Sequence, residues 1–286
     1  MKKLLCALTA VLFVLTAVMS VSAAAKVEGR KTCEAYVSDV TVDGKIEDAW
    51  NYAPKYEVTT VKTYEKNSYY KEGMKTGVDY ASEYCKVLWN GKDTLYVLAV
   101  VVDKTPFLTA EEGKSWNNDS VEIFWSFANS KTDTKAEKVQ TRIQSDGNII
   151  LNKAKFKDCK VVKTADGFVV EAAIDVSTVG GAGQYLGIDF QYNDSVKGKT
   201  RQVCLGWSDS ADKASSDPTV YGQCLLSATK VADKKAAAEA AKTTKAAATT
   251  AAAKTAAAAK TADVSVVIAA AAITAAAAAI VVKKKH

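Results

Sequence analysis

The chain has 286 residues, a formal net charge of +6 and a single histidine. The excess positive charge lies at the two ends, because residues 26–228 carry 26 basic and 29 acidic side chains. A basic face that would bind nucleic acid is therefore not expected on the folded part, and no nucleic-acid partner is predicted. The histidine is the final residue, His286. This position excludes a Ser-His or Cys-His nucleophile pair, a histidine zinc site and histidine-ligated haem from the folded part, so neither zinc nor haem is expected.

The first 25 residues have the layout of a secretory signal peptide. Two lysines, Lys2 and Lys3, precede an apolar run from Leu4 to Val21, and small residues follow at Ala23 and Ala25. This order of a basic, an apolar and a small-residue segment is typical of a signal peptide that is removed on export. We therefore expect residues 1–25 to be cleaved and the folded protein to be exported.

Residues 26–228 are predicted to form one all-β domain. Three turn signals, Asn90-Gly91, Asp146-Gly147 and Asp166-Gly167, each separate two apolar or alternating runs, which predicts three hairpins. The run 94–102 is apolar on both faces, so we expect a central strand there. Many short strands without a long amphipathic helix indicate an antiparallel, jelly-roll-like β-sandwich.

Two tryptophans occur close together in the stretch "SWNNDSVEIFW", which runs from Ser115 to Trp125. Side chains alternate between the two faces of a strand, so the following segment divides into two sets. Val121, Ile123, Trp125 and Phe127 form the set predicted to face the core, and Glu122, Phe124 and Ser126 form the opposite set. Trp116 lies before the strand among polar residues, so we expect its side chain to be exposed.

The exposed tryptophan and its polar neighbours predict a sugar-binding site. A pyranose ring presents an apolar C–H face and a rim of hydroxyls, which suit an aromatic plate beside fixed polar groups. Trp116 supplies the plate, and Glu122 lies on the non-core face of the next strand. Arg142 and Gln144 share one face of the strand after it. Charged side chains form the stronger hydrogen bonds to hydroxyls, which favours Glu122 and Arg142 as ligands.

Catalysis by a carboxylate pair is the less favoured alternative. A glycoside hydrolase needs an acid and a base at a defined separation. The candidate carboxylates are Asp119, Glu122, Asp146, Glu171 and Asp189. Their spacing singles out no pair, so the sequence predicts a protein that is not an enzyme.

Five cysteines follow the predicted signal peptide, namely Cys33, Cys85, Cys159, Cys204 and Cys224. Export permits disulfides, but an odd number leaves at least one thiol free, and the spacings match no zinc motif. Cys33 and Cys224 lie near the two ends of the domain. They are expected to meet if its first and last strands pair.

The C-terminal part is predicted to be a stalk, an anchor and a tail. Residues 229–263 are rich in Ala, Lys and Thr and are expected to form a partly helical, semi-rigid stalk. Residues 264–282 carry no charge, and 283–286 are a basic cytoplasmic tail. The five valines and three isoleucines of the anchor favour insertion by roughly 2 to 5 kcal/mol, at about 0.3 to 0.6 kcal/mol each. We therefore expect a transmembrane helix with the N-terminal domain outside. The alternative is an alanine-rich helix in solution.

Several sequence motifs are shared with a known family. They are, in chain order, "VDGKIEDAW", "KVLWNGKDTLYVLAVVVD", "WNNDSVEIF", "DGFVVEAAI", "GIDFQYND", "GWSD" and "DPTVYG". Residues from about 37 to 226 thereby resemble carbohydrate-binding module family 9, a β-sandwich sugar-binding module found on xylanases and other exported proteins. The resemblance implies that the partner is a polysaccharide or oligosaccharide.

The resemblance also implies which residues contact the sugar. In the family, a glucose-type ring lies between two tryptophans; the first corresponds to Trp116 and the second to Ser215, so one plate is missing. The implied polar contacts are Glu122, Arg142 and Gln191, with Gln144 in place of an asparagine. Loss of one stacking face corresponds to about 1–2 kcal/mol, or about tenfold in affinity.

Two residues of a long tyrosine-rich loop, Tyr69 and Tyr70, could replace the missing plate. Alternatively, the groove is open on that side and accepts the interior of a glycan chain instead of its end. The resemblance further implies structural calcium, for which Asp103, Asp119 and Asp194 are the candidate oxygen ligands.

The C-terminus resembles, more weakly, the tripartite cell-wall sorting signal of Gram-positive bacteria. The proline and glycine of the usual motif are absent from "KTAD", which favours an anchor that is retained. Together these features predict a surface-anchored, non-catalytic protein that holds plant-type glycan of the glucose or xylose type. The alternatives are a structural or adhesion protein whose sandwich has lost sugar binding, and a glycoside hydrolase.

Overall fold

The computed structural model describes residues 24–62, 73–104, 114–195 and 201–261. Residues 1–23 of the predicted signal peptide, the predicted anchor at 264–282 and tail at 283–286, and the candidates Tyr69 and Tyr70 lie outside these ranges. The chain divides into two compact units, Met1–Ala236 and Ala237–His286. The first contains all strands of the described residues.

Thirteen strands and four 3-10 helices make up the described part of the first unit. The strands are β1 (Thr32–Val37), β2 (Tyr56–Val58), β3 (Thr60–Val61), β4 (Ser82–Trp89), β5 (Thr94–Val102), β6 (Ser120–Ser126), β7 (Val139–Gln144), β8 (Ile149–Leu151), β9 (Phe156–Thr164), β10 (Gly167–Asp175), β11 (Tyr185–Asp194), β12 (Val203–Gly206) and β13 (Gly222–Lys230). The 3-10 helices are η1 (Asp48–Tyr52), η2 (Ser115–Asn117), η3 (Lys153–Lys155) and η4 (Pro218–Val220), and one α-helix, α1 (Val231–Thr261), follows β13. The predominance of strands confirms the predicted all-β class.

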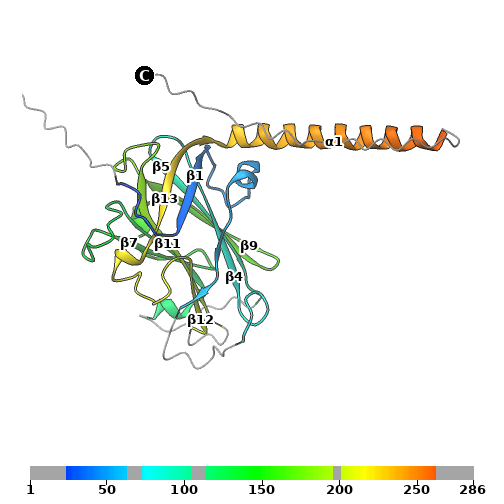
Figure 1. The fold of residues 1–286 in the computed structure, drawn as a ribbon. Helices are drawn as coiled ribbons and strands as arrows, with labels where there is room; N and C mark the ends of the chain where they lie inside the picture. Colours follow the sequence, from blue (N-terminus) through cyan, green and yellow to red (C-terminus); the bar gives the residue numbers. More distant parts are fainter. Residues whose placement is uncertain (1–23, 63–72, 105–113, 196–200, 262–286) are drawn as a thin grey trace, which may run out of the picture. The chain divides into compact units, whose positions relative to one another are not determined.

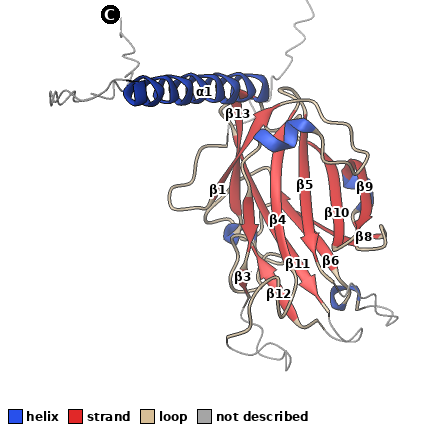
Figure 2. Ribbon diagram, turned by 90° about the vertical axis from the view of Figure 1, so that its right-hand side faces the viewer, coloured by secondary structure: helices blue, strands red, loops and turns tan. Residues whose placement is uncertain are grey.

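The strands hydrogen-bond in the order β8-β7-β6-β11-β13-β1-β4-β5-β10-β9, with β2, β3 and β12 attached beside this path. Figure 1 shows β1, β13 and β11 side by side, and Figure 2 shows the run β4-β5-β10-β9. The predicted antiparallel pairing holds for the other named strand pairs but not for β1, which pairs in parallel with both β13 and β4. No short turn connects these strands, so their direction is free of the constraint that makes a hairpin antiparallel.

All three predicted hairpins are present. The turns at Asn90-Gly91, Asp146-Gly147 and Asp166-Gly167 join β4 to β5, β7 to β8, and β9 to β10, and each pair is antiparallel. Strand β5 lies between β4 and β10 and is buried along most of its length. Its predicted central position is confirmed.

The main core lies between the two halves of this folded-over sheet. Trp125 of β6 packs on Phe156 of β9 with ring centroids 5.8 Å apart, and Phe168 of β10 packs on Tyr192 of β11 at 6.2 Å. Strands β6 and β11 come from one half of the strand order and β9 and β10 from the other. These aromatic contacts therefore join the two layers of a sandwich.

The predicted division of faces in β6 holds up to the end of the strand. Val121, Ile123 and Trp125 belong to the main core, as expected. The prediction for Phe127 is wrong: β6 ends at Ser126, so the alternation stops and 36% of Phe127 is exposed. On the opposite face Phe124 is also buried, because it packs against Tyr221.

Two of the sequence motifs meet at one buried carboxylate. Glu171 of "DGFVVEAAI" accepts hydrogen bonds from the indole N–H of Trp50 at 2.9 Å and from the backbone N–H groups of Asp43 and Gly44 at 3.0 and 2.9 Å. Gly44 has φ +82°, and a Cβ there would lie 2.2 Å from Val162. The loop "VDGKIEDAW" is therefore held against β10 by geometry that only glycine permits at position 44.

Cys33 and Cys224 lie opposite each other, as predicted, but they form no disulfide. The two residues are Cα partners in the β1–β13 pair, yet all five cysteines of the described residues are free thiols. Burial raises the pKa of Cys33 well above its ordinary value. The thiol is consequently held in its unreactive protonated form.

The predicted stalk is helical in the described region, where α1 covers it from Val231 onward. Strand β13 extends to Lys230, two residues beyond the predicted domain end, and Val231 packs in a second cluster with Trp50. None of the described helices is sufficiently long and apolar to cross a membrane. The anchor predicted at 264–282 falls outside the described ranges and stays a prediction.

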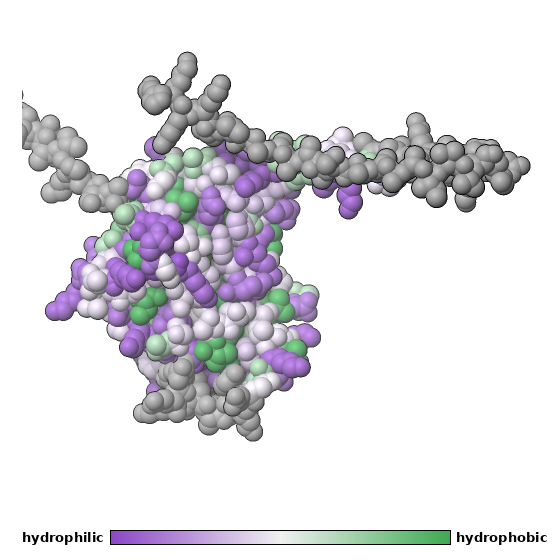
Figure 3. All heavy atoms as spheres, in the orientation of Figure 1, coloured by the Kyte–Doolittle hydropathy of each residue, from purple (hydrophilic) through white to green (hydrophobic). Residues whose placement is uncertain are grey.

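The surface of the domain is mixed in character. On the face drawn in Figure 3, hydrophobic residues lie in separate small groups among hydrophilic ones. The edge strand β9 carries lysines at 157, 160 and 163. Charged residues on an edge strand oppose pairing with a second sheet.

One core carboxyl predicts an unusual pH dependence. Glu83 of β4 is buried, and its Oε2 has no hydrogen-bond partner within the described residues. Burial raises the pKa of Glu83 to about 8. Because the unfolded chain ionises at its ordinary lower value, stability falls as the pH rises from about 4.5 towards 8.

We expect Glu83→Gln to raise the free energy of unfolding at pH 7 by on the order of 3 kcal/mol and to leave it nearly unchanged at pH 4. Urea unfolding at the two pH values measures this difference. Glu57→Gln, on the neighbouring strand β2 and exposed, is the control and should shift neither value by more than about 0.5 kcal/mol. An equal pH dependence for Glu83→Gln and the parent would contradict the expectation.

Candidate functional site

A polar pocket of about 430 Å³ lies over β6, β7 and β11. Its lining residues are Trp116, Glu122, Phe124, Gln140, Arg142, Leu151, Gln191, Arg201, Asp212 and Ser215. Most of them carry hydrogen-bonding side chains, and two ion pairs are among them. The volume is within the range of about 300–1,000 Å³ usual for small-molecule sites.

Trp116 supplies the exposed aromatic wall of the pocket. It lies in the short helix η2, and 38% of it is exposed, as the sequence predicted. Arg142 Nη1 donates a 2.7 Å hydrogen bond to Ser115 Oγ, the residue before it. The pocket arginine therefore also fixes the turn that carries the tryptophan.

A buried ion pair between Glu122 and Arg142 is part of the pocket lining. The two residues are directly opposite each other on β6 and β7, and Arg142 Nε lies 2.9 Å from Glu122 Oε1. Glu122 also accepts hydrogen bonds from Asn193 Nδ2 at 2.7 Å and from Gln140 Nε2 at 2.5 Å. These donors hold the buried carboxylate in one orientation.

A second ion pair lines the other part of the pocket. Arg201 Nη2 lies 2.9 Å from Asp212 Oδ2, and Arg201 Nη1 donates to Asn193 Oδ1 at 2.7 Å. Asn193 therefore links the two ion pairs, because its amide nitrogen bonds to Glu122. Asp212 has φ +57°, an uncommon conformation for a residue other than glycine.

The structure brings most of the sequence-predicted sugar contacts together. Trp116, Glu122, Arg142 and Gln191 all line this one pocket, and so does Ser215, the position implied for the missing tryptophan. Gln144 is buried and lies outside the lining residues. Gln140, two residues before Arg142 on the same face of β7, lines the pocket instead.

Several lining or supporting residues were not predicted. Asn193 and Gln140 could have been found by strand alternation, since each lies two positions from a predicted contact. Arg201 and Asp212 lie outside regular strands, where no periodicity indicates the direction of a side chain. Of the five carboxylates considered for catalysis, only Glu122 lines the pocket.

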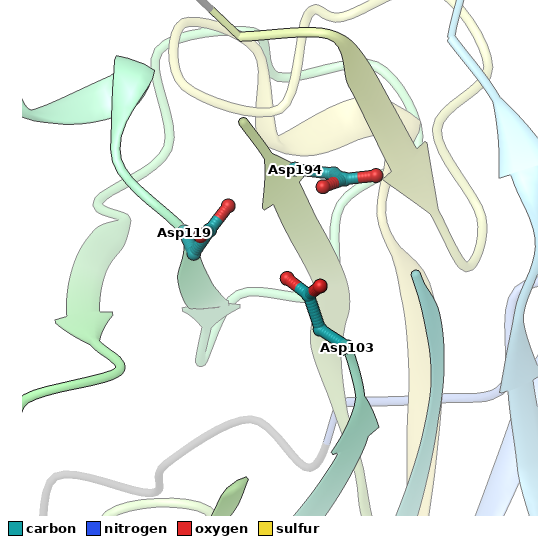
Figure 4. A group of neighbouring side chains, drawn as sticks. All are labelled: Asp103, Asp119 and Asp194. Atoms are coloured by element: carbon teal, nitrogen blue, oxygen red, sulfur yellow. The ribbon is translucent and has the colours of Figure 1, made fainter. Parts of the chain in front are cut away.

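The three predicted calcium ligands also come together. Asp103 follows β5, Asp119 precedes β6 and Asp194 ends β11; all three are buried, with ligand oxygens within 4.8 Å of one another. Figure 4 shows the three carboxylates pointing towards a common centre. Asp103 also accepts a 2.9 Å hydrogen bond from the hydroxyl of Tyr192.

This cluster fits a calcium ion. Calcium binds oxygens at 2.3–2.6 Å, so two ligands of one ion lie at most about 5 Å apart, as these do. Burial, aided by the nearby charge of Asp103, raises the pKa of Asp194 to about 7. A bound divalent cation would reverse this shift by favouring the ionised carboxylates.

Fold and site together define a β-sandwich module with a polar surface pocket. The chain belongs to the carbohydrate family 9 binding domain-like family, whose model matches residues 42–229. This match covers most of the first unit, including every residue of the pocket and of the aspartate cluster. The predicted family membership is thereby confirmed.

Curated relatives include endo-1,4-beta-xylanase A of Thermotoga neapolitana, 30% identical over 209 residues, and exoglucanase XynX of Acetivibrio thermocellus, 30% identical over 191 residues. The matches cover 70% and 65% of this chain, but only 18% and 16% of those proteins. The chain thus spans less than a fifth of the length of these relatives.

Two solved structures share the fold. Both are family 9 carbohydrate-binding modules from Caldicellulosiruptor kristjanssonii, one in complex with glucose and one with cellotriose. Their TM-scores are 0.57 and 0.58 at 22% and 21% identity. The similarity covers 68% and 69% of this chain and 95% and 94% of those chains, which supports a sandwich of the same type.

The aspartate cluster predicts that calcium stabilises the domain and changes its pH dependence. Without a cation, stability should fall as the pH rises from about 4 to 7, because Asp194 ionises more readily in the unfolded chain. Saturating calcium should raise the melting temperature at pH 7 by several degrees, and a chelator should remove the gain.

Calorimetric scans with calcium and with chelator at pH 4 and 7 test this prediction. Asp194→Asn should abolish most of the calcium response, while the control Asp39→Asn, exposed and outside the cluster, should keep it. A melting temperature that is unaffected by calcium at both pH values would contradict the prediction.

Proposed function

We propose that this chain is a non-catalytic carbohydrate-binding protein that is exported, held at the cell surface, and captures plant-type glycan of the glucose or xylose type. The observation that carries the proposal is the pocket lined by an exposed tryptophan together with the buried Glu122–Arg142 pair. Family membership supports the same class of ligand.

The pocket chemistry suits a neutral sugar. The C–H face of a pyranose can stack on Trp116, while Glu122 accepts and Arg142 donates hydrogen bonds to hydroxyls. Each lining carboxylate is paired with an arginine, so the described lining is close to neutral overall. A neutral hydroxyl-rich ligand fits this balance better than an acidic sugar, which would face Glu122 and Asp212.

The comparisons support a β-1,4-linked glycan. The named relatives are a xylanase and an exoglucanase, and the structural neighbours hold glucose and cellotriose. Xylan and cellulose fragments are therefore the first ligands to test. The pocket lacks a second aromatic plate at Ser215, which favours a site open on that side that accepts a chain interior.

A binding role fits the pocket carboxylates better than catalysis. Glu122 is held by Arg142, Gln140 and Asn193, and Asp212 is held by Arg201. A glycoside hydrolase needs two carboxyl groups free to face the bond that is cleaved, whereas each carboxylate of the described lining is engaged by an arginine. The pocket thus supports hydroxyl recognition without bond cleavage.

The second candidate is an adhesion or structural protein that has lost sugar binding together with the tryptophan at 215. The loss of that plate is the observation in its favour. The face drawn in Figure 3 weakens this candidate, because its hydrophobic groups are small and separate, whereas protein-binding surfaces usually present larger apolar patches.

Calorimetric titration with cello- and xylo-oligosaccharides tests the proposal. We expect binding by the parent protein and a loss of tenfold or more in Trp116→Ala, because removal of a stacking plate and its buried area costs more than about 1.4 kcal/mol. Phe127→Ala is the matched control, since Phe127 is exposed to a similar extent but does not line the pocket.

The outcomes separate the candidates. Absence of binding to every glycan would remove the proposed function and leave adhesion, and equal affinity in Trp116→Ala would remove the pocket as its site. Release of shortened products from the same sugars would instead establish a glycoside hydrolase.

Retention at the cell surface has its own test. If residues 264–282 anchor the protein, the C-terminal mass of the mature chain in the membrane fraction should include His286. A mature chain that ends at Thr261 would indicate cell-wall sorting instead, and a chain recovered only from the medium would contradict surface retention.

A further inference from the structure

A buried lysine lies directly beneath the pocket. Lys62 follows β3 and is only 3% exposed, and its ammonium group is 2.5 Å from Gln191 Oε1 and 3.0 Å from Asp209 Oδ2. It also lies 3.8 Å from Asp212 Oδ1. Lys62 therefore contacts two residues that line the pocket, although it is not itself a lining residue.

The fold makes specific room for this side chain. Strand β3 pairs with β12, and Lys62 N donates to Cys204 O at 2.8 Å, so the lysine enters from the end of a two-residue strand. A Cβ on Gly206 would lie 2.6 Å from Lys62 Cε and 2.4 Å from Asp209 O. The glycine is thus required by the packing of the lysine stem and the adjacent loop.

Asp209 connects Lys62 to the loop 208–215. Its Oδ1 accepts a hydrogen bond from Ala211 N at 2.8 Å, and its Oδ2 accepts from Lys213 N at 2.7 Å and Ala214 N at 2.8 Å. This loop wraps around the carboxylate and carries Asp212 and Ser215 to the pocket. The position of both residues consequently depends on Asp209.

The charges in this assembly are mutually dependent. Burial raises the pKa of Asp209, but Lys62 and the backbone donors outweigh it, so the net shift is downward. A second buried carboxylate, Asp189, lies close enough to be stabilised by Lys62 and accepts hydrogen bonds from Ser208 N and Asp209 N. Removal of the ammonium would leave buried carboxylates without their cation.

We infer that Lys62 is a positioning residue for the pocket, because its ammonium ties Gln191 on β11 to Asp209, which shapes the loop that presents Asp212 and Ser215. Lys62 sets the distance between Gln191 on β11 and the loop 208–215, and it does so without touching the ligand. The inference rests on the proposed function only in taking a sugar as the ligand.

The test compares Lys62→Met, which keeps the length of the stem but removes the charge, with the conservative Lys62→Arg. Lys86→Met is the matched control, since Lys86 is a half-buried lysine whose ammonium bonds to Trp50 O at 2.6 Å, away from the pocket lining. Two readouts are taken on the full chain under conditions where each variant is folded. They are amide hydrogen exchange without sugar and calorimetric affinity for cellobiose.

In Lys62→Met we expect exchange at the amides of Ala211, Lys213 and Ala214 to quicken tenfold or more, and affinity for cellobiose to fall tenfold or more. Lys62→Arg should recover at least a third of the parent affinity, because it restores the buried cation. Lys86→Met should change both readouts less than twofold. If Lys62→Met does not fold, Lys62→Gln replaces it with the same expectations.

Unchanged exchange and unchanged affinity would overturn the inference. Faster exchange with parent affinity would also overturn it, because Lys62 would then stabilise the loop without shaping the site. If the parent binds no sugar, the proposed function fails, and the exchange rates of the three amides alone decide whether Lys62 organises the loop.

Discussion

The pocket depends on one physical constraint, the burial of the Glu122 carboxylate within the sheet that lines it. A buried charge is tolerated only when hydrogen bonds and an opposite charge replace its water. Arg142, Gln140 and Asn193 meet this need, and each of them then has its own position fixed. Arg142 in turn fixes the turn before Trp116, so the aromatic wall also depends on the same carboxylate.

The same constraint extends to the loop side of the pocket. Asn193 hydrogen-bonds to both Glu122 and Arg201, and Arg201 forms an ion pair with Asp212. Lys62 in turn contacts Asp212, Asp209 and Gln191. Such a network resists rearrangement because its members are joined by several buried hydrogen bonds and ion pairs. Rigidity favours ligand binding, since side chains that are already ordered lose little conformational entropy when a ligand binds.

Sequence periodicity predicted the strands of this site better than its loops. Alternation along β6 separated Glu122 from the core residue Trp125, because a buried strand face imposes a period of two. The loop 208–215 has no such period, since its course follows the buried carboxylates of Asp189 and Asp209. Lys62 could not be predicted either, because a lysine that follows a two-residue strand resembles any surface lysine until its distant partners are known.

The order in which the strands pair was also only partly predictable from the sequence. Turn chemistry is local, so three hairpins could be predicted from Gly-containing turns. The parallel pairing of β1 with β13 joins residues almost 200 positions apart, and only the packing of the whole domain specifies it. The pairing of Cys33 with Cys224 follows from that topology, and both side chains pack in the apolar core as free thiols.

Two buried carboxyls with raised pKa values differ in physical meaning. Asp194 lies among other carboxylates whose oxygens are close enough together to bind one calcium ion. A bound cation would stabilise the ionised carboxylates and so offset the cost of burying them. Glu83 has only a weak contact to the thiol of Cys85 and an unsatisfied oxygen within the described part of the chain. Its raised pKa reflects a cost of burial and indicates no site. Geometry around the group therefore decides which perturbed carboxyl points to function, and the shift by itself does not.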